Sequence, residues 1–136
     1  MDPKFDFSGQ TAIVTGGARG IGRAIATQFV RSGAEVWIWD IHPVELNGAQ
    51  SLSVDVTKPD QIERALTPIV TQSTRIDILV NNAGNLGSYL PFDELDASEC
   101  QQIVQGNHLC LPELATQQAP PSSDPWSMAV RENDQE

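Results

Sequence analysis

The sequence is poor in positive charge: it has 8 lysines and arginines against 18 aspartates and glutamates, for a formal net charge of −10 at pH 7. This balance argues against a nucleic acid or an anionic membrane surface as partner. No apolar run approaches the roughly 20 residues needed to cross a bilayer, and no basic and apolar leader opens the chain. We therefore expect a cytoplasmic protein with neither a membrane nor a nucleic acid as partner.

Metal ligands and redox groups are also scarce. The two cysteines, Cys100 and Cys110, form no C-x-x-C pair, which favours free thiols inside a cell. The two histidines, His42 and His108, have no companion ligands at metal-binding spacing. We therefore predict no metal site.

The strongest signal present is a glycine-rich turn over residues 15–22, which reads TGGARGIG. An apolar run precedes it and an amphipathic stretch over 21–30 follows, with Gly33 placed to end a helix. Strand, turn and helix start in this order suit a diphosphate, because glycines let the backbone approach and the first helical turn presents unpaired N–H groups. The alternative is a glycine cluster that only packs a helix against a strand.

Three further runs predict strands. Residues 35–40 are almost continuously apolar, as in a strand buried on both faces, whereas 51–56 alternate and 76–80 are again apolar. The connection 41–50 is too short for a full crossover helix. Residues 57–70 predict a helix with Thr57 as its N-cap and Pro68 kinking its last turn.

Asp40 closes the second predicted strand about 20 residues beyond the glycine turn. An acidic residue in that place is positioned to accept hydrogen bonds from the ribose hydroxyls of an adenosine. The alternative is a strand-end aspartate that only starts a turn.

The spacing of Thr15, Gly16, Gly20 and Gly22, followed after a fourth strand by Asn-Asn-Ala-Gly at 81–84, resembles the short-chain dehydrogenase/reductase family from about residue 10 to 107. The resemblance implies an α/β Rossmann-like fold, a doubly wound parallel sheet with strand order 3-2-1-4, occupying residues 1–110. It also implies an oxidoreductase that transfers hydride between a nicotinamide cofactor and an alcohol or ketone.

Twelve residues match the cofactor-binding positions of that family. An acid at Asp40 favours NAD over NADP, because a carboxylate there repels a 2′-phosphate, whereas Arg19 argues the other way. For Asp55, adenine binding and a simple loop start are equally supported. The matching residues are Thr15, Gly16, Arg19, Gly20, Ile21, Gly22, Asp40, Asp55, Val56, Asn81, Ala83 and Gly84.

The acid/base residues of the family are missing. Its chemistry uses a tyrosine whose pKa is lowered by a lysine four residues later, together with a serine. Here the single tyrosine is Tyr89, position 93 holds an aspartate, and the lysines stand at 4 and 58. Asn107 lies near the place of the family's catalytic asparagine, although core asparagines in helices are also ordinary.

The last segment, 111–136, is rich in proline, serine and charge, which predicts a disordered tail that supplies no fifth strand. The fourth strand would then present an unpaired edge on which the chain could associate with itself or with a partner. Three interpretations follow: a chain belonging to an NAD-dependent oxidoreductase, a catalytically silent dinucleotide-binding module, or a truncated or frameshifted product.

Overall fold

The computed structural model describes residues 5–73, 75–84, 96–98 and 101. Within them, four parallel strands form one sheet in the order β3-β2-β1-β4, as the sequence predicts. Asn107 and the predicted tail 111–136 lie outside the described residues. The elements are β1 (Thr11–Thr15), α1 (Gly20–Arg31), β2 (Glu35–Asp40), β3 (Ala49–Ser53), α2 (Pro59–Gln72) and β4 (Ile78–Val80).

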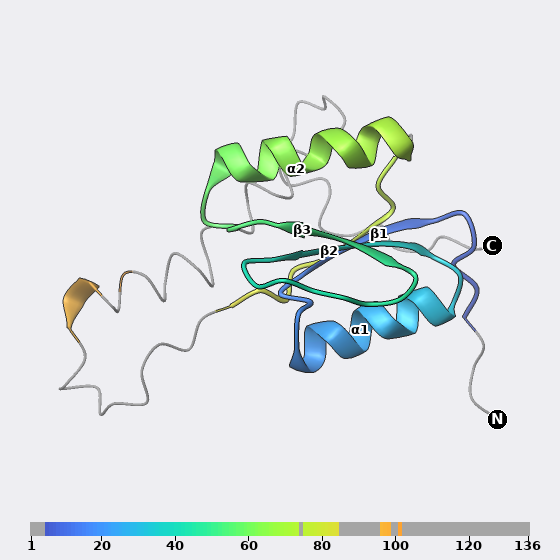
Figure 1. Ribbon diagram of the computed structural model, residues 1–136, viewed down its shortest axis with the longest axis horizontal. Helices are drawn as coiled ribbons and strands as arrows, with labels where there is room; N and C mark the ends of the chain where they lie inside the picture. The colour runs from blue at the N-terminus through green and yellow to red at the C-terminus, as the bar shows by residue number, and fades with distance from the viewer. Residues whose placement is uncertain (1–4, 74, 85–95, 99–100, 102–136) are drawn as a thin grey trace, which may run out of the picture.

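The two helices cover opposite faces of the sheet (Figure 1). β1 is buried along its whole length and β2 at its four central residues, because each strand lies inside the sheet and meets a helix on both sides. Their side chains therefore alternate between two cores. On the α2 face the buried residues are Ile13, Trp37, Trp39, Val54, Val56, Ile62, Ala65 and Ile69. On the α1 face they are Val14, Ala26, Ala34, Val36 and Ile38.

The end of α1 follows the predicted pattern. Gly33 has a φ of 87°, and the N–H groups of Gly33 and Ala34 donate to the carbonyls of Val30 and Phe29. These two bonds close the helix in a Schellman motif, which needs a residue with positive φ at this place. The tight exit leads directly into β2 beside β1.

Three local expectations need correction. β3 spans Ala49–Ser53, not 51–56, so Asp55 lies in the loop beyond the strand. The N-cap of α2 is Lys58, not Thr57, because the Thr57 N–H and hydroxyl both bind the Asp55 carboxylate at 2.9 and 2.6 Å. α2 contains Pro68 and ends at Gln72, two residues beyond the expected end, and Ile69 is fully buried; the kink expected at Pro68 stays a prediction. The connection 41–48 contains no crossover helix, as predicted, and only bends and a turn.

A polar cluster joins the carboxyl ends of β1 and β4. The Thr15 hydroxyl, on a residue that is 1% exposed, donates to the Val80 carbonyl at 3.2 Å and accepts the N–H groups of Asn82 and Ala83, both at 3.0 Å. The Asn82 side-chain amide donates in turn to the carbonyls of Thr15 and Gly16, both at 3.1 Å. Hydrogen bonds thus hold the segment after β4 to the end of β1 where the ladder between the strands stops.

We expect Thr15→Val to lower the free energy of unfolding by about 1–3 kcal/mol, because two backbone N–H groups lose their acceptor in a largely buried place. Thr11→Val is the matched control. Thr11 is buried in the same strand, and its hydroxyl makes no hydrogen bond with any residue that the structure describes. Urea unfolding followed by circular dichroism measures both; equal losses would contradict the role assigned to the Thr15 hydroxyl.

Candidate functional site

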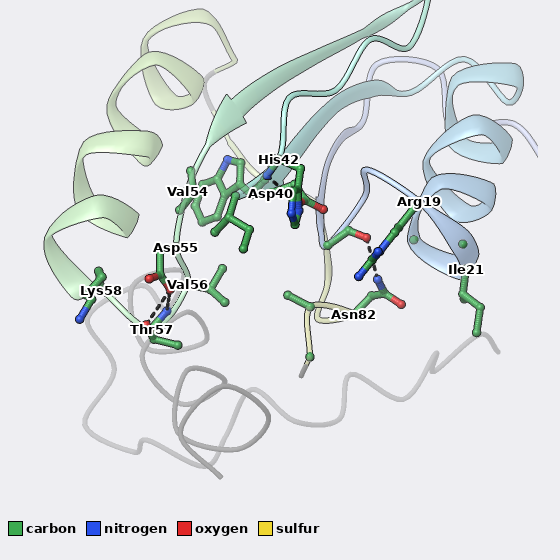
Figure 2. A pocket seen from close by; sticks show the side chains of 17 residues that line it. Arg19, Ile21, Asp40, His42, Val54, Asp55, Val56, Thr57, Lys58 and Asn82 are labelled. Atoms are coloured by element: carbon green, nitrogen blue, oxygen red, sulfur yellow. Dashed lines mark hydrogen bonds and ion pairs between the residues drawn. The ribbon is translucent and has the colours of Figure 1, made fainter. Parts of the chain in front are cut away.

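A cleft of about 890 Å³ lies at the carboxyl ends of the strands (Figure 2). Parallel strands end on the same edge of a sheet, so the segments that follow all four strands meet there. The cleft sits where the chain order reverses between β1 and β4, the usual ligand site of such folds. Ten of the twelve predicted cofactor-binding residues line it: Gly16, Arg19, Gly20, Ile21, Gly22, Asp40, Asp55, Val56, Ala83 and Gly84.

The glycines of the turn meet different constraints. Gly16 and Gly20 have φ values of 68° and 57°, a region that other residues rarely adopt. A Cβ on Gly16 would come within 2.8 Å of Ala83, whereas one on Gly20 would meet no protein atom within 4 Å. Gly22 carries no Cβ because one would strike the Gly16 carbonyl and the Asn82 amide. Gly16 and Gly22 therefore admit the Asn82 segment, and the backbone at Gly20 stays open to the cleft.

The start of α1 carries unpaired donors beside this turn. Its N-cap, Arg19, is extended and its side chain does not cap the helix; no acidic residue lies in the first turn. The Arg23 N–H makes the first helical bond, to the Arg19 carbonyl at 3.3 Å. The N–H groups of Gly20, Ile21 and Gly22 consequently have no partner within the helix. Together with the helix dipole they favour an anion at the glycine turn.

Asp40 reaches the same turn from the end of β2. Its carboxylate, 9% exposed, accepts the Ala18 N–H on Oδ2 at 2.9 Å, and on Oδ1 the His42 N–H at 2.9 Å and ring Nδ1 at 3.2 Å. Burial alone would raise the pKa of Asp40, but the bonds from His42 and Ala18 outweigh it and hold the pKa below its usual value. Asp40 is therefore a charged acceptor at neutral pH.

Asp55 serves the turn before α2. Its Oδ1 accepts both groups of Thr57, and its own N–H donates to the Gln61 side chain at 2.8 Å. Oδ2 makes no hydrogen bond with any described residue, and Asp55 lines the cleft. The loop-start interpretation of Asp55 is thus correct, and adenine binding stays a prediction.

Thr15 and Asn81 are the two predicted residues that do not line the cleft. Thr15 lies beneath it and positions Asn82, while Asn81 is exposed. The structure brings the neighbouring Asn82 into the wall instead. Successive side chains of an extended segment point to opposite sides, so only one of the two adjacent asparagines can point inward. The motif alone does not reveal which one.

Sequence reasoning missed several other residues of the site. Trp39, His42, Thr57 and Lys58 line the cleft, and Arg23 ties the glycine turn to the loop after β2 by donating to the Ala18 carbonyl at 3.4 Å and the Glu45 carbonyl at 2.9 Å. Trp39 directly precedes Asp40 and His42 follows it by two residues. Their closeness to Asp40 is the feature of the sequence that could have identified them as site residues.

Trp39 is fully buried, and its indole N–H is without a partner among the described residues. An unpaired donor costs free energy in a protein interior. Because Trp39 lies in the cleft wall, a bound ligand or water would satisfy its indole N–H.

The described residues contain no group of three potential metal ligands, and none of their helices is long and apolar enough to cross a membrane.

Known proteins resemble this chain over most of its length. The short chain dehydrogenase/reductase dpfgG of Gibberella zeae is 34% identical over an alignment of 123 residues, and the match covers 81% of this chain and 46% of that protein. The ligand-free aldohexose dehydrogenase of Thermoplasma acidophilum superposes with a TM-score of 0.74 at 32% identity, over 84% of this chain and 43% of the other.

The 3-ketoacyl-(acyl-carrier-protein) reductase of Brucella melitensis, in complex with NADH, superposes with a TM-score of 0.76 at 25% identity, over 82% of this chain and 50% of that one. This chain thus spans half or less of the length of these relatives. A family model for short chain dehydrogenases matches residues 10–121, so it extends past residue 107, where the resemblance seen in the sequence ends. The chain therefore belongs to the short chain dehydrogenase family.

Proposed function

We propose that this chain binds NAD in the cleft and is the cofactor-binding part of an NAD-dependent oxidoreductase acting on an alcohol or ketone. The observation that carries the proposal is the Asp40 carboxylate, held 2.9 Å from the Ala18 N–H of the glycine turn. That contact supports the proposal, because a ribose held by Asp40 would then lie beside a diphosphate held by the glycine turn. The Brucella melitensis relative, solved with NADH, supports the same cofactor class.

The residues present fit such a cofactor at three points. The unpaired N–H groups at the start of α1 would hold the diphosphate, Asp40 would accept the ribose hydroxyls, and the apolar wall near Val54 and Val56 would cover the adenine. The open space beside Gly20 leaves room for backbone contact. The nicotinamide ring supplies the hydride chemistry when the cofactor is bound.

Asp40 favours NAD over NADP because its negative charge stands where a 2′-phosphate would lie. Arg19 and Lys58 also line the cleft and would attract that phosphate. Asp40 outweighs them, since its carboxylate is nearly buried and fixed by three hydrogen bonds, whereas long basic side chains are flexible and readily solvated.

A second candidate, a catalytically silent dinucleotide-binding module, is favoured by the absence of Tyr-x-x-x-Lys from the 136 residues. Binding needs the described cleft alone, whereas proton transfer to an alkoxide needs a placed acid/base group. The two candidates share the binding step and differ only in turnover.

We expect the chain to bind NAD⁺ roughly tenfold or more tightly than NADP⁺ at pH 7.5, with Asp40→Asn narrowing the difference by removing the repelling charge. Asp60→Asn removes the same charge from the exposed face of α2, where Asp60 pairs with Arg64, and should leave the ratio unchanged. Isothermal titration calorimetry measures the four affinities. Tighter NADP⁺ than NAD⁺ binding by the unaltered chain would refute the preference.

We expect no measurable oxidation of a panel of secondary alcohols and polyols by the purified chain with NAD⁺. General acid/base catalysis contributes a factor of roughly 10²–10⁴, and the groups that supply it in the family are missing. NADH production followed at 340 nm is the measurement. A steady rate that survives a second purification would show that another group performs the proton transfer.

The outer edge of β4 is proposed to associate with another chain. Among the described residues β4 pairs with β1 alone, and its three residues are apolar and half-buried. Unpaired strand edges of this kind pair with other strands. We expect size-exclusion chromatography to give oligomers and denaturant unfolding to be broad; a monomer with one sharp cooperative transition would contradict this.

A further inference from the structure

His42 is bonded to Asp40 through both its backbone and its ring. The backbone N–H and ring Nδ1 approach the same carboxylate oxygen, Oδ1, at 2.9 and 3.2 Å. A carboxylate only accepts, so Nδ1 carries the proton that faces it. Nε2 is then the nitrogen that gains or loses the imidazole's second proton, and the ring is 61% exposed in the cleft wall.

These bonds fix the carboxylate from both sides. Ala18 holds Oδ2 toward the glycine turn while His42 holds Oδ1, so the plane of the Asp40 carboxylate is set before any ligand arrives. His42 therefore acts through Asp40 as well as through its own charge. Figure 2 shows the two side chains together, with Arg19 on the α1 side and Asp55 and Lys58 toward the start of α2.

Resting on the proposed function, we propose that His42 is a specificity-determining residue that sets NAD against NADP according to its charge. With a neutral ring, Asp40 and His42 together carry a charge of −1 and repel a 2′-phosphate. With a protonated ring the sum is zero, and the imidazolium itself attracts the phosphate. The other charged groups lining the cleft, Arg19, Asp55 and Lys58, do not hydrogen bond the ring.

The direction of the pH dependence follows from this charge balance. An imidazole gains a proton and a positive charge as the pH falls, whereas Asp40, with its lowered pKa, stays ionised between pH 5.5 and 8.0. NADP acceptance is therefore greatest at acidic pH and is lost as pH rises and the ring becomes neutral. A unit charge at this exposed position should change the ratio of the two affinities roughly threefold to tenfold.

The 2′-phosphate also titrates near pH 6, so a pH effect on NADP⁺ binding alone proves nothing about the protein. A variant that keeps the phosphate's titration and removes the ring separates the two. His42→Asn retains the backbone N–H and a polar side chain but cannot become charged. His42→Lys holds a positive charge across the whole range.

The test is calorimetric titration of the full 136-residue chain and both variants with NAD⁺ and NADP⁺ at pH 5.5 and 8.0, with circular dichroism to check folding. The measured quantity is the Kd for NADP⁺ divided by the Kd for NAD⁺. We expect this ratio to fall from pH 8.0 to pH 5.5 in the unaltered chain and in His42→Asn. The fall should be roughly threefold to tenfold larger in the unaltered chain than in that variant. In His42→Lys the ratio should already be low at pH 8.0.

Two results would overturn the inference in different ways. In the first, the chain prefers NAD⁺, but the ratio has the same pH dependence in the unaltered chain and in His42→Asn, or stays high in His42→Lys at pH 8.0. His42 would then not determine specificity, and the proposed function would still stand. Failure of the folded chain to bind either nucleotide removes the proposed function and the inference with it. His108→Asn, at the only other histidine, must leave the ratio's pH dependence intact.

Discussion

The cleft depends on the hydrogen bonds between Thr15 and Asn82. β1 and β4 pair in the sheet, but the paired residues Ala12 and Ile78 are 66 residues apart in the sequence. The long segment between the two strands must therefore bring β4 back beside β1 in the correct register. Backbone pairing aligns only three residue pairs. The Thr15 hydroxyl and the Asn82 amide then continue the connection past the end of the ladder. Without them the wall formed by residues 82–84 would have no fixed position against the glycine turn.

The same cluster explains the glycines better than the ligand alone. The Asn82 amide occupies the space where a Cβ on Gly22 would stand, and Ala83 approaches Gly16. Small residues at these places are therefore needed for strand-to-strand packing as well as for the anion. Gly20 is different: its φ is positive, but a Cβ added to it would meet no protein atom within 4 Å. One motif thus serves two physical requirements at separate positions.

The sequence predicted most of the fold because the central strands β1 and β2 are buried on both faces and therefore read as continuous apolar runs. It misplaced β3, an edge strand with three exposed residues whose alternating pattern extends past its real end. The positions of the site residues in the sequence were largely predictable, because these residues follow the ends of the strands. Side-chain directions were not: periodicity does not reveal that Asn82 rather than Asn81 turns inward, or that His42 binds Asp40.

A protein with a net charge of −10 can still favour an anionic nucleotide, because binding depends on the local field and not on the total. At the glycine turn the helix start presents unpaired N–H groups with no acidic residue in its first turn, and Arg19 stands beside it. The Asp40 carboxylate, 9% exposed, accepts the Ala18 N–H of the same glycine turn. The glycine turn thus brings the N–H groups of the helix start and the fixed negative charge of Asp40 close together in one part of the cleft. Under the proposed function, that arrangement would suit a diphosphate joined to a neutral diol better than a third phosphate at the same sugar.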